Sequence, residues 1–284
     1  MTTTDDPKRK SRFPLHLGTG KTTPCRWARS LYVNSKRSLG ILTDLLTTSK
    51  PATLGWRDYL TVQFTPVRYQ PLLFPGGEVI EHRRDESILD SRDKLLAIGL
   101  PDNLTGKTVL DIGCAEGFFV IQAVLRGAER AIGCDIMEPR LRIARAVAKA
   151  WRMQDRVLFS RTDLHNIPLE WASDVVFCFA VVHHLHSSSG EPRFHDTWQM
   201  ISNPRKYAKY VNNMLRAVAA VSSLTKEVTY WEYSFEYEDH KPRDVNHGAL
   251  GRLWVQNGLY QAVDFVGLSQ TLPMKDRALY RAFK

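Results

Sequence analysis

From Thr105 onward, short apolar runs alternate with stretches of helical periodicity, and no other feature of the chain restricts its fold as strongly. This alternation is typical of a parallel sheet whose strands are joined by crossover helices. The last two apolar runs have no helix between them, which indicates an antiparallel pair at the end of the chain. The expected strands are 108–112, 130–134, 157–160, 174–182, 227–235, 261–267 and 277–283, and the expected helices are 117–126, 138–151, 204–221 and 248–257.

The positive charge of the protein is concentrated at its N-terminus. The 284 residues include 39 lysines and arginines and 30 acids, a net charge of +9. Residues 1–50 hold ten of the basic residues and three of the acids, or +7, so the rest of the chain carries only +2. We therefore expect a basic, partly disordered arm over 1–50. Three roles for this arm are open: a solvated tail, capture of RNA phosphates, and contact with an anionic membrane surface.

The segment between the arm and the alternating region has a different composition. Residues 51–87 are rich in proline and aromatic side chains, and the prolines argue against a helix over 50–77. A helix is expected over 85–100, where apolar residues recur with helical spacing. The predicted parts of the chain are therefore the arm at 1–50, a cover segment at 51–87 and the main domain at 88–284.

Several functions are disfavoured by what the chain contains. The stretch Gly18–Thr22 looks like part of a phosphate-binding P-loop, but Leu15 stands where that motif needs its first glycine. The four cysteines form no metal-ligand pattern, so we expect no metal site and a reducing, cytoplasmic environment. No apolar run approaches the roughly 18 residues that cross a membrane, so no transmembrane segment is expected. The polar N-terminus is unlike a secretory signal.

The stretch Val109–Phe119 joins the first expected strand to the next helix, and it carries the strongest functional signal. In a doubly wound sheet this junction binds the nucleotide part of a ligand. Gly113 allows the chain to turn sharply, and Gly117 allows close entry into the helix. Asp135, at the end of the second strand, occupies the position that hydrogen-bonds ribose hydroxyls.

The residues around this turn distinguish between two cofactors. A dinucleotide site would have glycines where this chain has Gly113, Ala115 and Phe118, and the phenyl ring would obstruct helix–strand packing. The carboxylates of Asp111 and Glu116 would repel a pyrophosphate. They suit S-adenosylmethionine, which has no phosphate and carries an amino group and a sulfonium. The motif therefore favours S-adenosylmethionine.

With these residues, the stretch resembles the D-x-G-x-G-x-G motif of class I S-adenosylmethionine-dependent methyltransferases, with Ala115 in place of the middle glycine. The resemblance covers about residues 88–284. It implies an α/β fold with a doubly wound, Rossmann-like, seven-stranded sheet, an antiparallel C-terminal strand and an N-terminal extension. It also implies that Asp163, just after the third strand, meets the adenine amine. The implied cofactor-binding residues are Asp111, Gly113, Ala115, Glu116, Gly117, Phe118, Asp135, Ile136, Asp163 and Leu164.

Within that class, the sequence is similar to two groups. The first is the methyltransferase domain of the kinase–methyltransferases that cap O-antigen chains. It shares the Asp111–Phe119 stretch, the His183-His184 stretch followed by Ser-Gly, Tyr230-Trp231, and the Leu279-Tyr280 ending. That resemblance implies an acceptor on a phosphorylated sugar terminus. The second is the group of enzymes that alkylate the wobble uridine of tRNA, which has a similar lead-in to the motif over 104–111.

The acceptor side of such a site would lie beyond the fourth and fifth strands. His183 and His184 follow the fourth strand, where a general base could act on a hydroxyl or protonated amine, and His184 is favoured. Trp231 and Tyr233 could form a wall of the acceptor pocket. We expect methyl transfer to a small polar acceptor or to one that bears a glycosyl or phosphate group. The alternative is a tRNA or rRNA methyltransferase that captures RNA with its arm; the expected location is the cytoplasm, with peripheral contact to the membrane as a further alternative.

Overall fold

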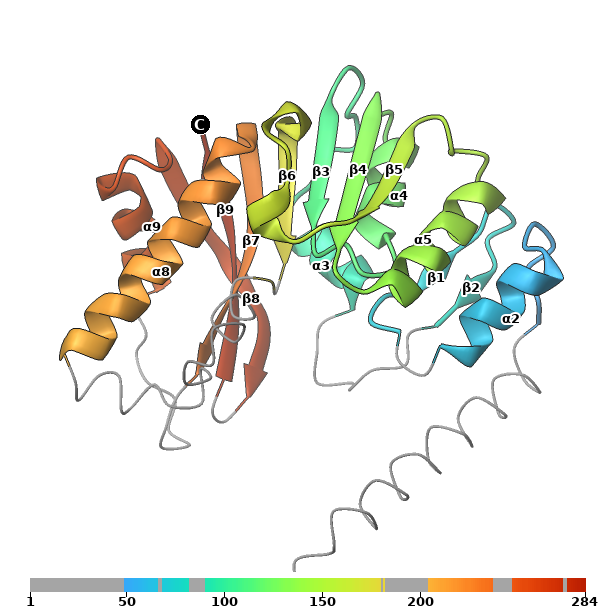
Figure 1. Cartoon of the computed structure of the whole chain (residues 1–284), viewed down its shortest axis with the longest axis horizontal. Helices are drawn as coiled ribbons and strands as arrows, with labels where there is room; N and C mark the ends of the chain where they lie inside the picture. The colour runs from blue at the N-terminus through green and yellow to red at the C-terminus, as the bar shows by residue number, and fades with distance from the viewer. Residues whose placement is uncertain are drawn as a thin grey trace, which may run out of the picture.

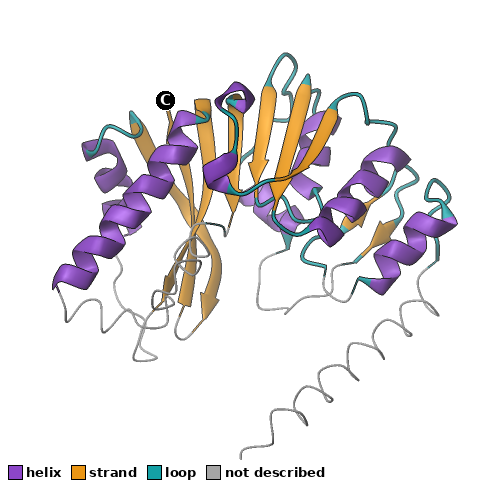
Figure 2. Ribbon diagram, viewed as in Figure 1, coloured by secondary structure: helices purple, strands orange, loops and turns teal. Residues whose placement is uncertain are grey.

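The protein is built around a seven-stranded mixed sheet with helices on both faces (Figure 1; Figure 2). This computed structural model describes residues 49–65, 68–81, 90–179, 181, 204–236, 247–272 and 275–284. The strand order is β5-β4-β3-β6-β7-β9-β8. The strands are β3 (Thr108–Ile112), β4 (Arg130–Asp135), β5 (Val157–Arg161), β6 (Ser173–Phe179), β7 (Thr225–Glu236), β8 (Ala262–Leu272) and β9 (Lys275–Phe283).

This topology confirms the predicted α/β, Rossmann-like fold. Strands β3 to β7 pair in parallel, whereas β9 pairs antiparallel with both β7 and β8. The expected antiparallel pair at the end of the chain is therefore present. Its last strand lies inside the sheet and β8 forms the edge, so the C-terminal residues of the chain are held between two neighbours.

Two hydrophobic cores lie on opposite faces of the sheet. Helices α4 (Phe118–Leu125) and α5 (Glu138–Ala150) contribute to one core, and α8 (Pro204–Ser223) and α9 (His247–Gln256) contribute to the other. The central strands are therefore buried on both sides, which explains why their sequences are almost continuously apolar. None of the helices in the described ranges is both long and apolar enough to cross a membrane.

The segment before β3 contains a helix that the proline pattern did not predict. Helix α2 (Trp56–Phe64) lies between Pro51 and Pro66, so these prolines bound the helix instead of interrupting it. The expectation that this segment has no helix is therefore wrong. Tyr59 and Val62 on its inner side are buried in the core that α5 shares.

A small hairpin connects α2 to the main domain. Its strands β1 (Leu72–Leu73) and β2 (Val79–Ile80) pair antiparallel, and helix α3 (Ser91–Ala97) follows them. This helix begins at Ser91, after its N-cap Asp90, and ends at Ala97, so it is shorter than the helix expected over 85–100.

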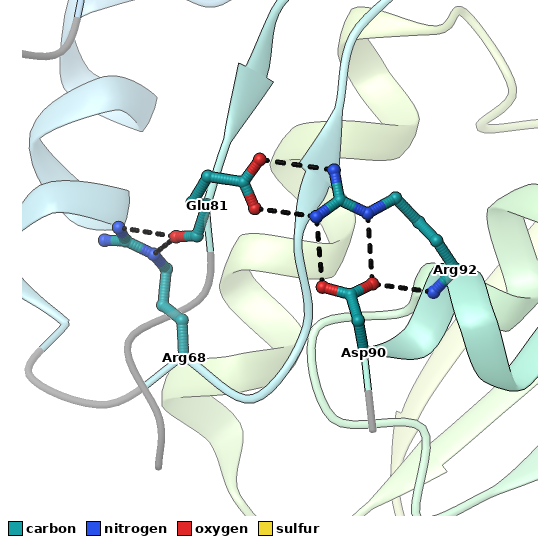
Figure 3. Close-up of polar contacts among 4 residues, drawn as sticks. All are labelled: Arg68, Glu81, Asp90 and Arg92. Atoms are coloured by element: carbon teal, nitrogen blue, oxygen red, sulfur yellow. Dashed lines mark hydrogen bonds and ion pairs between the residues drawn. The ribbon is translucent and has the colours of Figure 1, made fainter. Parts of the chain in front are cut away.

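Four polar residues tie the hairpin to the start of α3 (Figure 3). Asp90 caps the helix by accepting a hydrogen bond of 2.8 Å from the backbone N–H of Arg92. The Arg92 guanidinium pairs with the carboxylates of Asp90 and Glu81, each at 3.0 Å. Arg68 in turn donates to the carbonyl oxygen of Glu81 at 3.1 Å. The hairpin is thereby held against the domain that carries the site.

Candidate functional site

The turn between β3 and α4 holds three residues in left-handed backbone conformations. The φ angles are +76° at Gly113, +49° at Ala115 and +82° at Gly117. At Gly117 a side chain would also collide, because a Cβ atom would lie 2.8 Å from the ring of Phe159. Ala115 adopts its conformation at a steric cost that glycine would avoid. The turn therefore keeps its shape although the middle glycine of the motif is missing.

The end of β4 anchors this turn. The backbone N–H of Gly113 donates to the carbonyl oxygen of Cys134 at 2.7 Å. Asp135 accepts hydrogen bonds from the N–H of Ala115 (3.0 Å) and from the N–H of Met137 (2.8 Å). Asp135 therefore joins the turn to the start of α5, a positioning role that the sequence did not predict. Its contact with a ribose stays a prediction.

Two acids of the motif are buried with an oxygen that lacks a donor. Asp111 is 2 % exposed and Glu116 is 1 % exposed. Within the described ranges, Oδ2 of Asp111 and Oε1 of Glu116 have no hydrogen-bond partner. Burial, reinforced by the charge of Asp135, raises the pKa of Asp111 to about 8. Burial raises the pKa of Glu116 to about 7, although Arg140 opposes the shift. Such oxygens favour a ligand that donates hydrogen bonds or carries positive charge.

The segment just before the hairpin packs onto the same turn. The N–H of Tyr69 donates to Oε2 of Glu116 at 3.2 Å, and the amide oxygen of Gln70 accepts from the N–H of Phe118 at 2.9 Å. The guanidinium of Arg140 stacks on the ring of Tyr69, 4.2 Å from its centroid. The sequence indicated a cover here only in general terms, and it missed Gln70, which satisfies the first N–H of α4.

The other predicted cofactor residues lie beside the ends of β4 and β5. The side chain of Ile136 is 61 % exposed. Asp163 caps the short 3₁₀ helix η1 (Leu164–Asn166) and accepts a hydrogen bond of 2.9 Å from the N–H of His165. Leu164 is buried beneath this cap. Their contacts with an adenosyl group stay predictions.

A buried ionic cluster lies at the carboxyl ends of β6 and β7. Lys94 is 3.0 Å from the carboxylate of Glu232, Arg277 is 3.7 Å from the same oxygen, and Ser269 donates to the other oxygen. Burial alone would raise the pKa of Glu232, but Lys94, Arg277 and Ser269 together hold that pKa below its usual value. The Lys94 ammonium also lies 5.4 Å from the ring centroid of Phe179. Among the described residues, two basic side chains thus pair with Glu232.

This cluster was missed at the sequence level, although α3 carries a signal of it. Ser91, Lys94, Leu95 and Ile98 are all buried, and their spacing forms one helix face. A lysine on an otherwise buried face indicates a buried partner. The charge of Lys94 also opposes the upward pKa shift of Asp111, so the cluster acts electrostatically on the motif acid of β3.

The predicted acceptor residues have different surroundings. Trp231 is fully buried and packs against Trp254 of α9, with ring centroids 5.1 Å apart. Tyr233 is 5 % exposed in the same core. Both side chains therefore contribute to packing on the α8–α9 face in this arrangement. His183 and His184 lie outside the described residues, so their roles stay predictions.

The fold and the turn define the class of protein. Counted from β3, the strand order is 3-2-1-4-5-7-6, with the glycine turn after the first strand and an acid at the end of the second. Residues 109–202 also match the family model described as a methyltransferase domain. The chain therefore carries a match to a methyltransferase domain within a Rossmann-like fold.

Known proteins resemble parts of this chain. The tRNA U34 carboxymethyltransferase of Enterobacter sp. (strain 638) is 33 % identical over 85 residues, which are 30 % of this chain and 26 % of that protein. The enzyme of the same name from Photorhabdus laumondii is 34 % identical over 84 residues, with the same shares. The chain thus spans about a quarter of the length of these curated relatives.

Solved structures support the fold. The N-terminal domain of EvdMO1, crystallised in the presence of SAH and D-fucose, superposes with a TM-score of 0.53 at 11 % identity. The match covers 82 % of this chain and 99 % of that domain. At this level of identity, the similarity concerns the arrangement of the strands and helices.

Proposed function

We propose that this chain binds S-adenosylmethionine at the turn between β3 and α4 and transfers its methyl group to a small polar acceptor or to one that bears a glycosyl or phosphate group. The proposal of cofactor binding rests on two buried carboxyl oxygens, on Asp111 and Glu116, that have no hydrogen-bond donor among the described residues. These acids would hold the positively charged end of the cofactor. When bound, the cofactor supplies an electrophilic methyl group on a sulfonium.

The role of the protein in such a transfer is mainly alignment. An in-line displacement needs the acceptor atom, the methyl carbon and the sulfur in one line, so a rigid turn lowers the barrier through orientation. The left-handed residues Gly113, Ala115 and Gly117 and the two hydrogen bonds to Asp135 provide that rigidity here. The packing of Tyr69 and Gln70 against the turn supports exclusion of water from it.

The character of the acceptor is inferred from the charge beside Asp111. Lys94 and Arg277 are two basic side chains close to Glu232, and Lys94 acts electrostatically on Asp111. Basic surroundings favour an acceptor that is anionic or rich in oxygen over a purely apolar one. A second candidate is an RNA acceptor, favoured by the tRNA U34 carboxymethyltransferases among the relatives and by the charge of +7 over residues 1–50.

An acceptor panel tests the two candidates directly. We expect the full-length protein, supplied with S-adenosylmethionine, to release S-adenosylhomocysteine with phosphorylated sugars and to release less with the same sugars without phosphate. Unmodified tRNA transcripts serve as the parallel acceptor. Turnover with tRNA alone would overturn the glycosyl or phosphate assignment and favour the RNA candidate. Failure to bind S-adenosylhomocysteine in titration calorimetry would overturn the cofactor assignment.

The proposed base gives a separate prediction. If His184 removes a proton from the acceptor, His184→Gln should lower the rate of methyl transfer about 100- to 10,000-fold while cofactor affinity stays unchanged. The wild-type rate should rise with pH through the usual imidazole range, because the base must be neutral, and the variant should lose this limb. His183→Gln is the matched control. Equal, small effects of both substitutions would show that the acceptor needs no histidine base.

A further inference from the structure

Helix α2 presents an apolar stripe to solvent. Trp56, Leu60 and Phe64 recur at every fourth position and are 67 %, 42 % and 59 % exposed. Their spacing places them along one side of the helix, whereas Tyr59 and Val62 next to this side are buried, and the ring of Trp56 meets that of Tyr59 edge-on with centroids 5.8 Å apart. Single exposed apolar residues are common on proteins, but three large ones in a row along a helix indicate a contact surface. We call these three residues the α2 stripe.

Basic side chains flank the α2 stripe. A pocket of about 490 Å³ lies between α2 and α5, which Figure 1 shows next to each other at one end of the molecule. Trp56 lines this pocket together with four basic residues and one acid, namely Arg57, Arg142, Arg145, Lys149 and Asp58.

The positive charge of this surface is only partly neutralised. Lys149 pairs with Asp58 at 3.5 Å, and Arg145 pairs with Glu138 at 2.6 Å. No ion pair involves Arg57 or Arg142 within the part of the chain that the structure describes. Both arginines are exposed, so their charge faces solvent beside the α2 stripe.

We propose that the α2 stripe and the basic outer face of α5 bind the surface of an anionic lipid membrane. An interfacial helix buries aromatic and leucine side chains at the boundary between headgroups and acyl chains, while nearby arginine and lysine contact anionic lipids. Here the α2 stripe and the basic residues of α5 lie side by side, which is the combination that an interfacial helix needs.

A lipid surface explains the exposure of more of these residues than RNA would. A single-stranded nucleic acid needs phosphate contacts and a flat ring for stacking, which Arg57, Arg142 and Trp56 alone would supply. It gives no reason for Leu60 and Phe64 to be exposed in line with Trp56. The apolar stripe together with the charge therefore favours a lipid surface.

Vesicle binding by the full-length protein tests the proposal. We expect co-sedimentation with vesicles of phosphatidylcholine mixed with phosphatidylglycerol, and much weaker co-sedimentation with phosphatidylcholine alone. The double variant Arg57→Glu/Arg142→Glu should lower the partition coefficient at least about 25-fold, since each basic residue near an anionic surface is worth roughly fivefold. Leu60→Ser/Phe64→Ser should also lower the partition coefficient, because it removes the apolar contribution to binding. That loss should persist at high salt, where the electrostatic contribution is screened.

Two control variants separate this surface from general effects. Arg130→Glu removes an exposed arginine at the start of β4, and Leu169→Ser removes a leucine that is 68 % exposed outside α2. Neither should alter vesicle binding, and all four variants should keep wild-type affinity for S-adenosylhomocysteine, so failure of this proposal is distinguishable from failure of the proposed function.

The outcomes that overturn the proposal are equally specific. Absence of vesicle binding at low salt would do so, as would binding by Leu60→Ser/Phe64→Ser that equals that of the wild type. Binding of single-stranded RNA that is lost in Arg57→Glu/Arg142→Glu and kept in Leu60→Ser/Phe64→Ser would assign the surface to nucleic acid instead.

Discussion

Replacing Asp111 with asparagine should weaken the binding of S-adenosylmethionine and at the same time stabilise the free protein. The Oδ2 atom of Asp111 is buried without a hydrogen-bond partner among the described residues, so its charge is uncompensated wherever the pH is high enough to ionise the carboxyl in the free state. Asparagine keeps the shape and removes that charge. We expect the free energy of unfolding to rise by about 1–3 kcal/mol at pH 8, as for relief of an unsatisfied buried group.

The stability gain should depend on pH in a defined direction. The pKa of Asp111 is raised from 3.8 to about 8 in the folded protein. The folded state therefore retains a proton that the unfolded state releases, so the wild type loses stability as pH rises between these two values. The difference between Asp111→Asn and the wild type should grow over this range and level off above pH 8, which urea unfolding at several pH values measures.

Whereas the stability of Asp111→Asn should rise, its affinity for S-adenosylmethionine should fall. Loss of one partner from a buried charge pair costs about 2–5 kcal/mol, or roughly 30-fold to several thousand-fold in Kd. Titration calorimetry measures this directly. Asp155→Asn, which removes an exposed acid before β5, is the matched control and should change neither quantity. If Asp111→Asn bound S-adenosylmethionine as the wild type does, the proposed role of Asp111 would be wrong.

Removing Lys94 should destabilise the protein more than the loss of any surface lysine. Lys94 and Glu232 form an ion pair of 3.0 Å whose side chains are 7 % and 1 % exposed. Lys94→Met would leave Glu232 buried with only the more distant Arg277 as a charge partner. Breaking a buried pair in this way costs about 3–5 kcal/mol, which corresponds to a fall in Tm of roughly 10 °C for a chain of this size.

The chain offers a matched control for Lys94. Lys107 pairs with Glu227 at 2.6 Å, but the two side chains are 40 % and 49 % exposed. Lys107→Met should therefore cost less than about 1 kcal/mol. Adding Glu232→Gln to Lys94→Met should recover part of the lost stability, because it removes the unpaired charge. Thermal unfolding measures both losses of stability. If Lys94→Met and Lys107→Met lost the same stability, burial of the Lys94–Glu232 pair would not be the reason for its contribution.

Prediction from sequence succeeds best for the sheet and for the turn. The strands β3, β4 and β5 lie where the apolar runs placed them, because a strand buried on both faces leaves a continuous apolar signature. The glycines at 113 and 117 were predicted from their freedom of conformation, and both have positive φ. Helix α2 was missed because proline was taken as evidence against any helix nearby, whereas it excludes a helix only where it would sit inside one.

The contacts of individual site residues were harder to predict from the sequence. Trp231 was predicted to form a pocket wall because it follows a strand near its carboxyl end; in the structure its side chain packs in the core beside Trp254, and a contact with the acceptor stays a prediction. On a strand, successive side chains alternate between faces, and sequence alone does not say which face a site uses. Glu232, the residue between the two aromatics that were chosen, is the one that meets Lys94 and Arg277.

The class of fold and the cofactor turn follow from local sequence, because strand periodicity and the backbone freedom of glycine are properties of a few neighbouring residues. The pairing of Lys94 with Glu232 joins residues 138 positions apart, and the α2 stripe becomes a surface only where α5 places its arginines beside it. Which carboxyl oxygens lack donors is likewise a result of packing. These features depend on distances between remote residues, which only the folded chain establishes.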